Sequence, residues 1–259
     1  MSNLFFEKYG NWALVTGASS GIGKQFCYQL ADMKFNLVIV ARRIDRLNAI
    51  SAELKKKHNI EVVVVGLDLS QESFMEKLTQ ATEDIPLNLL VNCAGFAVTG
   101  EFISHPVTTD LALLHVNCSA PMLLSRHYGQ KMAERKKGGI INIASASAYL
   151  PIPFWASYSA SKVFLLHFSE ALWYEMKKYG VDVIAICPPS TNTEFGSIAK
   201  INMPGISAET VVSTALQNLG KKTSITIGFG LSVSMIFMKL FSRKTVVLLA
   251  SKIIRNQAT

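Results

Sequence analysis

The sequence predicts an α/β fold: a single Rossmann-like domain with a doubly wound parallel sheet of about seven strands, flanked by helices. Short apolar runs rich in β-branched residues alternate along the chain with longer stretches whose apolar residues recur at helical spacing. Alternation of this kind is typical of βαβ units, whose strands are parallel. The chain has 259 residues, 49% of them hydrophobic, and we find no repeat or linker rich in Pro, Gly or Ser. We therefore expect one domain over residues 1–259.

The expected strands are short and the expected helices are longer. Strands are expected at residues 12–16, 36–41, 61–66, 87–91, 139–144, 181–187 and 223–228. Helices are expected at residues 21–33, 45–58, 70–83, 110–134 and 157–179. These elements form a core at about residues 10–228, followed by an apolar basic helical segment at about 231–256. In such a sheet, ligands bind beyond the carboxyl ends of the strands, where the strand order reverses.

The overall composition narrows the class of partner. The formal net charge is +8 at pH 7, which favours anionic partners. Basic residues are spread along the chain without a dense run interleaved with aromatics, so we expect no nucleic-acid binding. The cysteines and histidines lack metal-ligand spacing, and we expect no metal site. Widely separated cysteines, and residues 1–10 without the apolar run of a secretory signal, predict a reducing, cytoplasmic location.

A glycine-rich turn follows the first expected strand. It continues directly into the first expected helix. Glycines let the backbone approach a pyrophosphate closely, and a helix N-terminus offers free N–H groups and a partial positive charge. We therefore predict that this turn binds a dinucleotide through Gly17, Ser19, Ser20, Gly21, Ile22 and Gly23.

The end of the second expected strand indicates which dinucleotide is preferred. Folds that prefer NAD usually place an acidic residue here against the ribose hydroxyls, whereas this chain has Arg42 followed by Arg43. A guanidinium can pair with a 2′-phosphate through two hydrogen bonds, so Arg42 predicts NADP(H) in preference to NAD(H). Arg43 and Lys24 are either helpers or solvated surface charges. Asp68, after the third strand, is expected to bind the adenine amino group, to cap the helix near Ser70, or both.

Three polar residues form a candidate reacting centre. Tyr158 and Lys162 are four residues apart on one face of an expected helix, and Ser145 ends the preceding strand. A phenol with its ordinary pKa near ~10 needs a nearby cation to exchange protons at neutral pH, and Lys162 can supply that charge. Tyr158 can then donate a proton to a carbonyl oxygen that Ser145 holds in place. The pattern predicts hydride transfer between a nicotinamide and a carbonyl or alcohol carbon.

With these motifs in this order, residues 10–195 resemble the short-chain dehydrogenase/reductase family. The glycine motif of the family matches residues 16–23, its adenine-side aspartate matches Asp68, and its Asn-Asn/Cys-Ala-Gly segment matches residues 92–95. The resemblance implies that Asn92, Ala94 and Gly95 stabilise the central sheet and lie along the cofactor. It also assigns the catalytic serine, tyrosine and lysine to the three residues named above.

The resemblance adds a fourth catalytic residue, Asn117, which holds a water that links Lys162 to solvent. It implies that Lys162 also binds the nicotinamide ribose and that Tyr158 is the general acid/base. The pattern is most similar to the branch that contains 3-oxoacyl and hydroxysteroid reductases.

One segment departs from the family pattern. After the sixth strand the family usually has Pro-Gly and then a threonine, whereas this chain has Pro188-Pro189 before Thr193. The second proline stiffens the segment beside the nicotinamide. Pro188 and Thr193 are still expected to contact the cofactor, Thr193 at the carboxamide or phosphate.

Apolar residues between Ser145 and Tyr158 predict a lipophilic substrate. Residues 149–155 have the sequence Tyr-Leu-Pro-Ile-Pro-Phe-Trp and would line the mouth of the site. Phe96, Phe102 and Phe195 adjoin the cofactor segments, and each either extends this wall or packs in the core.

The last part of the chain, residues 225–254, is apolar, and all its charges are basic. Its longest uncharged stretch, residues 224–238, has fifteen residues and two glycines, so we do not expect it to span a membrane. In the final helix Lys244, Lys252 and Arg255 lie opposite Val246 and Ala250, as in a helix resting on an anionic membrane surface. A lid over the site, or a contact within a homodimer or homotetramer, would suit the same helix equally.

Together these features predict an NADPH-dependent oxidoreductase that reduces a hydrophobic ketone or aldehyde, such as an acyl or steroid-like compound. Within the enzyme class, the alternative is a dehydrogenase that oxidises a secondary alcohol. Two alternatives are not enzymes. One is a sensor or scaffold that binds NADPH without turnover, and the other is a structural protein recruited to a membrane. The intact Ser145, Tyr158 and Lys162 argue against both non-catalytic classes.

Overall fold

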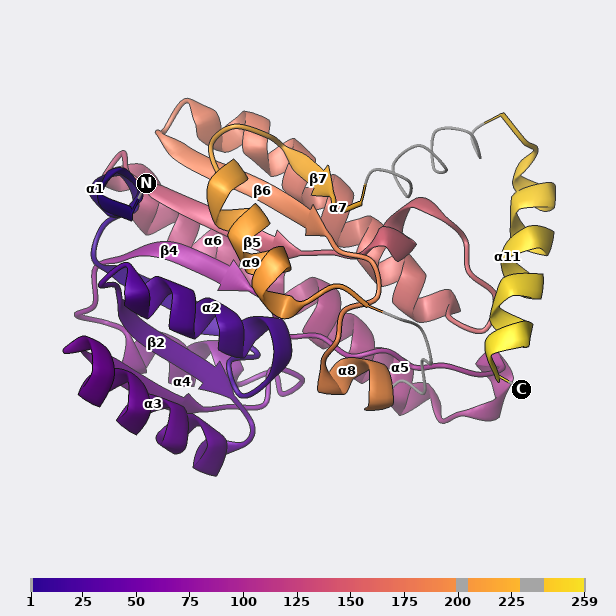
Figure 1. The fold of residues 1–259 in the computed structure, drawn as a ribbon, viewed down its shortest axis with the longest axis horizontal. Helices are drawn as coiled ribbons and strands as arrows, with labels where there is room; N and C mark the ends of the chain where they lie inside the picture. Colours follow the sequence, from indigo (N-terminus) through magenta and orange to yellow (C-terminus); the bar gives the residue numbers. More distant parts are fainter. Residues whose placement is uncertain (1, 199–204, 229–239, 259) are drawn as a thin grey trace.

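A parallel sheet of seven strands forms the centre of the computed structural model, which describes residues 2–198, 205–228 and 240–258 (Figure 1). The strands are β1 (Trp12–Thr16), β2 (Asn36–Ala41), β3 (Val62–Gly66), β4 (Leu87–Asn92), β5 (Gly138–Ile143), β6 (Val181–Cys187) and β7 (Ser224–Thr226). Their order is β3-β2-β1-β4-β5-β6-β7, so the winding reverses between β1 and β4. The predicted strands are confirmed, with small shifts at their ends.

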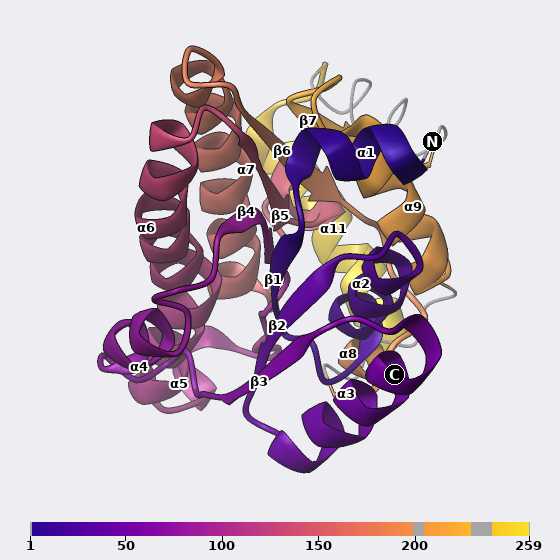
Figure 2. The same ribbon diagram turned by 90° about the vertical axis from the view of Figure 1, so that its left-hand side faces the viewer.

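Helices cover both faces of the sheet (Figure 2). One face carries α2 (Gly21–Asp32), α3 (Ile44–His58) and α9 (Ala208–Asn218), and the other carries α4 (Phe74–Ala81), α6 (Ala120–Glu134) and α7 (Ala156–Lys177). Each face has its own apolar core, with Phe26 and Leu30 of α2 in one and Leu124 and Tyr128 of α6 in the other. Because both faces are covered, the strands are buried on both sides, which explains their continuous apolar runs.

The helix expected at residues 110–134 has three parts. It begins as α5 (Val107–Leu114), passes through a π-helical turn, η2 (His115–Ser119), and continues as α6. A π-helical turn inserts an extra residue into the helical repeat and often marks a functional site. The turn carries Asn117, which is buried.

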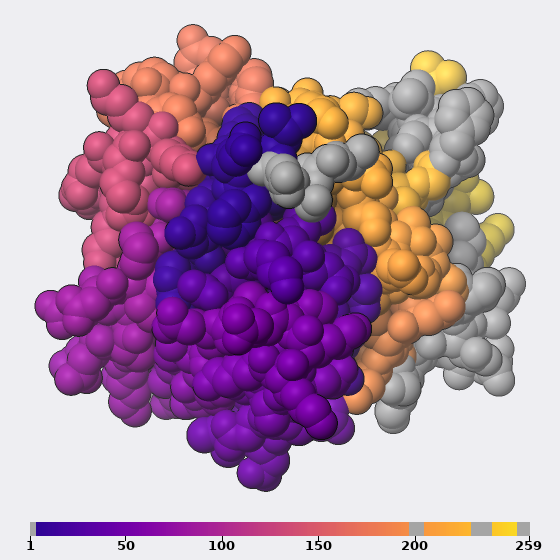
Figure 3. Space-filling view, turned by 60° about the vertical axis from the view of Figure 1, so that its left-hand side comes forward, coloured from indigo at the N-terminus to yellow at the C-terminus, as the bar shows by residue number. Residues whose placement is uncertain are grey.

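A helix that the sequence did not predict, α1 (Ser2–Tyr9), lies on the surface at the amino ends of the strands (Figures 1 and 3). The Tyr9 hydroxyl donates a hydrogen bond of 2.8 Å to Asp182, and the Lys8 ammonium pairs with the same carboxylate at 2.6 Å. These contacts fix α1 against β6, at the end of the sheet opposite the cavity described below.

The C-terminal part of the chain forms α11 (Arg243–Ala258), which stands at the end toward which the strands point (Figure 1). The predicted extension began at residue 231, but residues 229–239 lie outside the described residues. Val246 and Ala250, one helical turn apart, are buried, whereas Leu248 and Lys252 are exposed. Over the described part of the chain, no helix is both long and apolar enough to cross a membrane.

Candidate active site

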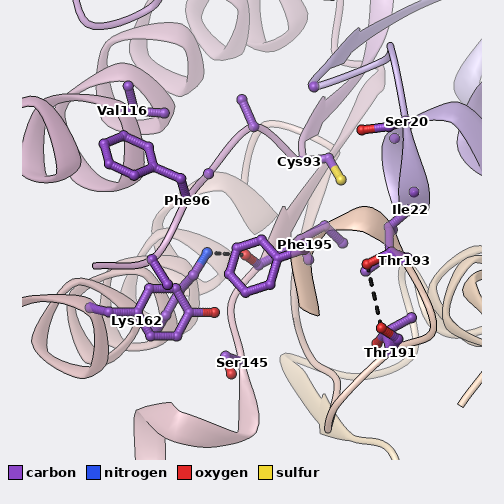
Figure 4. Close-up of a pocket in the computed structure, with 18 of the residues that line it drawn as sticks. Ser20, Ile22, Cys93, Phe96, Val116, Ser145, Lys162, Thr191, Thr193 and Phe195 are labelled. Carbon is purple, nitrogen blue, oxygen red and sulfur yellow. Dashed lines mark hydrogen bonds between the residues drawn. The ribbon is translucent and has the colours of Figure 1, made fainter. Parts of the chain in front are cut away.

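A cavity of about 680 Å³ opens at the carboxyl ends of the strands, across the point where the winding reverses. This is where a doubly wound sheet is expected to bind its ligand. Every residue predicted to bind the cofactor lines this cavity except Asn92, namely Gly17, Ser19, Ser20, Gly21, Ile22, Gly23, Arg42, Asp68, Ala94, Gly95, Tyr158, Lys162, Pro188 and Thr193. Figure 4 shows Ser20 and Ile22 of the turn facing the same space as Lys162 and Ser145.

The glycine turn between β1 and α2 has the shape that a dinucleotide cradle requires. Gly17 and Gly21 have φ angles of 67° and 53°, a conformation that costs side-chain-bearing residues energy. A Cβ on Gly23 would lie 2.3 Å from the carbonyl oxygen of Gly17, so only glycine fits there. The turn therefore leaves backbone N–H groups and the start of α2 open to an anion, and the residues fit a dinucleotide.

Thr16, at the end of β1, joins the glycine turn to β4, the neighbouring strand in the sheet. The sequence did not predict this role. Its Oγ1 accepts hydrogen bonds from the backbone N–H groups of Cys93 and Ala94, both at 3.0 Å, and donates to the carbonyl of Val91 at 3.3 Å. Thr16 is buried, and its hydroxyl fixes the segment after β4 that lines the cavity.

Arginines gather at the end of the cavity beside β2. Arg42 and Arg43 both line it, as the sequence predicted for Arg42. Arg43 is more than a helper, because its guanidinium donates hydrogen bonds to Ser19 Oγ at 3.0 and 3.2 Å and to Ser20 Oγ at 2.7 Å. Lys24 instead lies over the ring of Tyr28, 5.5 Å from its centroid, and does not line the cavity.

Asp68 lines the same end of the cavity and also organises its own loop. One carboxylate oxygen accepts hydrogen bonds from the backbone N–H and the hydroxyl of Ser70, at 2.9 and 2.8 Å. Burial would raise the pKa of Asp68, but these hydrogen bonds and the charge of Arg42 outweigh it and hold the pKa below its usual value. Its contact with Ser70 is confirmed, although α4 begins only at Phe74.

Tyr158 lies in the first turns of α7 and is buried in the wall of the cavity. Burial raises the pKa of its hydroxyl to about 12, although the nearby hydroxyls of Ser145 and Ser147 act in the opposite direction. The sequence predicted that Lys162 would bring this pKa down, but burial raises it, and the groups that act against burial are Ser145 and Ser147. Tyr158 is therefore protonated at neutral pH and can serve as a proton donor.

Lys162 lies one helical turn after Tyr158, with its Nζ 5.7 Å from the centroid of the tyrosine ring. The Nζ donates a hydrogen bond of 3.0 Å to the carbonyl of Ile143, at the end of β5 (Figure 4). Burial lowers the pKa of Lys162 to about 8. At neutral pH the lysine thus keeps its positive charge beside the phenol.

Ser145 follows β5 directly, and its Oγ accepts a hydrogen bond of 3.1 Å from the backbone N–H of Ser147. This bond begins the short helix η3 (Ala146–Tyr149) and fixes the Ser145 side chain. Ser147 is a second hydroxyl beside Tyr158 that the sequence analysis missed. Its spacing two residues after Ser145 was the available signal.

Asn117 in the π-helical turn lies next to the reacting centre. Its Nδ2 donates to the carbonyl of Phe96 and to Ser161 Oγ, both at 3.0 Å, and its Oδ1 accepts from the N–H of Phe96 at 3.2 Å. A Cβ on Gly95 would lie 3.1 Å from Asn117 Oδ1 and 3.4 Å from Lys162 Nζ. The predicted catalytic asparagine, serine, tyrosine and lysine therefore come together.

Asn92 differs from the other predicted cofactor residues because its side chain points into the protein. It donates hydrogen bonds to Asn142 Oδ1 at 2.8 Å and to Ser125 Oγ at 3.2 Å, and Asn142 in turn donates to Ser169 Oγ at 2.9 Å. This buried network ties β4, β5, α6 and α7 together. Asn92 thus supports the sheet, and its side chain does not line the cavity.

The substrate end of the cavity is apolar and aromatic. The ring of Tyr158 lies between those of Trp155 and Phe195, with centroids 5.6 and 5.8 Å away. Further apolar lining comes from Phe96, Val116, Leu150, Ile152 and Ala250. Phe102 was a candidate for this wall, but its side chain is 61% exposed and does not line the cavity.

Comparison with known proteins identifies the family. Residues 11–201 match the family described as short chain dehydrogenase. The chain belongs to this family. The short-chain dehydrogenase is 33% identical over 223 residues to a very-long-chain 3-oxoacyl-CoA reductase of Mus musculus, covering 85% of this chain and 72% of the mouse protein. It is 31% identical over 233 residues to a 7β-hydroxysteroid dehydrogenase of Collinsella aerofaciens, covering 86% and 88% of the two chains.

Solved structures agree with this assignment. A structure of a 7β-hydroxysteroid dehydrogenase superposes with a TM-score of 0.87 at 29% identity, covering 95% of this chain and 98% of that one. A short-chain dehydrogenase of Sphingobium yanoikuyae in complex with NADPH superposes with a TM-score of 0.80 at 27% identity, covering 87% and 92%. The protein is therefore an oxidoreductase of the short-chain dehydrogenase family with a Rossmann-like fold.

In this short-chain dehydrogenase the arrangement favours proton donation to an oxygen in an apolar site. A protonated phenol faces the cavity, a buried ammonium lies beside it, and two serine hydroxyls can share a hydrogen bond with the same oxygen. The rings of Trp155 and Phe195 make the surroundings of the phenol apolar, which strengthens electrostatic interactions with a developing negative charge.

Proposed function

We propose that the protein is an NADPH-dependent reductase of hydrophobic ketones or aldehydes. One observation carries the proposal: a single cavity joins the arginines beside β2 to a buried Tyr158 that is enclosed by Trp155 and Phe195. The arginines suit a 2′-phosphate, and the aromatic wall suits a lipophilic carbonyl compound. The names of the relatives, a very-long-chain 3-oxoacyl-CoA reductase and a 7β-hydroxysteroid dehydrogenase, support the same substrate classes.

Residues around the cavity have separate roles in the proposed reduction. Bound NADPH supplies the hydride. Tyr158 donates its proton to the carbonyl oxygen, and Ser145 and Ser147 hold that oxygen in line with the phenol. Lys162 would stabilise the phenolate that remains and hold the ribose of the bound cofactor, while Asn117 would hold a water that links Lys162 to solvent. Oxidation of a secondary alcohol uses the same groups in reverse.

A panel of carbonyl substrates tests this function. We expect kcat/KM with NADPH to rise as the alkyl groups of a ketone series are lengthened, and to exceed the value with NADH. Faster reduction of small polar hydroxyketones would contradict the substrate class. Tight NADPH binding without turnover of any carbonyl or alcohol would instead favour the alternative of a non-catalytic NADPH-binding sensor or scaffold.

We propose that α11 covers the substrate end of the cavity. Ala250 lines the cavity and Val246, one turn earlier, is buried, so the inner face of the helix belongs to the site. The outer face carries Lys244 and Lys252 around Leu248, all exposed. We propose that this face rests on an anionic membrane surface at the cytoplasmic side. A Lys244→Glu, Lys252→Glu variant that sediments with anionic vesicles as well as the wild type would contradict this.

We propose that the protein forms a homodimer or homotetramer. Val107, Leu111 and Leu114 of α5 form a stripe at helical spacing and are 68, 59 and 41% exposed. An apolar stripe of this kind is typical of an interface between subunits. Light scattering should show a smaller particle for Leu111→Glu than for the wild type, and a monomeric wild type would overturn the proposal.

A further inference from the structure

The segment after β6 contacts three separate parts of the cavity through three consecutive residues. We call residues 191–196 the strap. Thr193 lies against the glycine turn, since its Cβ and Cγ2 are 3.1 Å from the position a Cβ on Gly21 would take. Phe195 packs on the ring of Tyr158 at 5.8 Å. Between these two contacts, Glu194 begins α8 (Glu194–Ile198), the short helix labelled in Figure 1, and its carboxylate accepts hydrogen bonds from Arg46 of α3.

Glu194 pairs with two arginines at the 2′-phosphate end of the cavity. Arg43 Nη1 donates to its Oε2 at 2.9 Å, and Arg46 Nη1 donates to Oε1 and Oε2 at 2.7 and 2.9 Å. Hydrogen bonds from Arg43 and Arg46 hold the pKa of Glu194 below its usual value, so the carboxylate is ionised at neutral pH. Both Arg43 and Glu194 line the cavity.

The guanidinium of Arg43 is already fixed on its other side. Its Nε and Nη2 donate to Ser19 Oγ, and Nη2 also donates to Ser20 Oγ. Nη1 is therefore the nitrogen of Arg43 that faces away from the two serines, and it donates to the carboxylate of Glu194. A phosphate monoester carries acceptor oxygens and a larger negative charge, so it would seek the same donors.

We propose that Glu194 competes with the 2′-phosphate of the cofactor for Arg43, and that Arg46 retains the carboxylate once the phosphate has bound. This inference rests on the proposed preference for NADPH. It adds one residue, Glu194, that determines how strong the preference is. Glu194 limits how far the site favours the phosphorylated cofactor, because a bound 2′-phosphate must displace the carboxylate and then tolerate its charge nearby. A dinucleotide without the 2′-phosphate meets neither effect.

The test uses Glu194→Gln, which keeps the size of the side chain and removes its charge. Titration calorimetry compares ADP-ribose with its 2′-phosphorylated form, so no hydride transfer is needed. The variant should bind the phosphorylated probe about fivefold more tightly in low-salt buffer, with a gain that shrinks as salt is added. Its affinity for ADP-ribose should not change.

The matched control is Glu83→Gln, the same charge change at an exposed residue that precedes β4, at the amino end of the sheet. It should leave both affinities unchanged, since it lies away from the cavity. Equal or weaker binding of the phosphorylated probe by Glu194→Gln would overturn the proposal, because Glu194 would then not compete with the phosphate. Equal affinity of the wild type for both probes would overturn the NADPH preference itself, a failure seen without any variant.

Discussion

Thr16→Val should destabilise the fold by about 2–4 kcal/mol, although valine has nearly the shape of threonine. In the structure, the buried Oγ1 of Thr16 accepts hydrogen bonds from the N–H groups of Cys93 and Ala94, both at 3.0 Å. A valine methyl cannot accept them. A donor that loses its partner away from water costs about 1–3 kcal/mol, and because the N–H groups of Cys93 and Ala94 are only partly buried, the sum stays within the stated range.

Urea unfolding followed by circular dichroism measures this loss in the cofactor-free protein. Thr16→Ser is the matched control, because it keeps the hydroxyl and should lose only about 1 kcal/mol for the methyl group. Thr16→Val should also weaken dinucleotide binding, since the residues it releases line the cavity. A midpoint for Thr16→Val equal to that of Thr16→Ser, with the same slope, would refute the assignment of Thr16 as the tie between β1 and β4.

Four further predictions concern the cavity. Lys162→Met should abolish activity yet stabilise the fold by about 1–2 kcal/mol at neutral pH, because burial that lowers the lysine pKa to about 8 opposes folding; lower stability in thermal unfolding would contradict this. In the wild type the same shift should make stability rise between pH 8 and the unfolded-state lysine pKa near ~10.4, while the reduction rate falls as Lys162 loses its charge. Arg43→Gln should weaken NADPH binding about tenfold and leave NADH unaffected, whereas Lys24→Gln should change neither; equal losses for both cofactors would refute the phosphate role. Ala250→Phe should raise KM for bulky ketones more than for small ones, and unchanged kinetics would remove α11 from the site.

The sheet could be predicted from the sequence because both of its faces are covered. Strands such as β2 and β6 are buried on both sides and therefore appear as continuous apolar runs. The helix α1 was missed because its eight residues are mixed in character, and Tyr9 and Lys8 are fixed by Asp182, far away in the sequence. The π-helical turn at Asn117 has no comparable signal in the sequence, since apolar spacing continues through it.

The catalytic set could be predicted because its spacing is local and its motifs are specific. Tyr158 and Lys162 are one helical turn apart, and Ser145 ends the strand before that helix. This spacing is enough to predict that the three side chains lie close together. Contacts between distant segments could not be predicted in this way. Arg43 contacts the cradle because Ser19 and Glu194 lie beside it, and nothing near Arg43 in the sequence distinguishes it from its neighbour Arg42.

The side-chain directions of Asn92 and Phe102 could not be predicted from the sequence either. Asn92 adjoins the segment along the cofactor, but Asn142 on the neighbouring strand and Ser125 on α6 turn its amide inward. Phe102 begins η1 (Phe102–Ser104), a single 3₁₀ turn before α5 whose direction the sequence does not specify, and its ring is exposed. In both cases the tertiary neighbours decide where the side chain points.

Tyr158→Phe tests the central claim, that the protonated phenol donates to a carbonyl oxygen during reduction, most directly. The measurement is the rate of NADPH oxidation in a single turnover with a hydrophobic ketone, together with NADPH affinity from fluorescence. Tyr149→Phe is the matched control, because Tyr149 bonds Cys187 and Thr226 and does not line the cavity. The account predicts that Tyr158→Phe binds NADPH normally and is slowed by about 10²–10⁴-fold, while Tyr149→Phe stays near the wild-type rate. A Tyr158→Phe rate close to that of the wild type would contradict it.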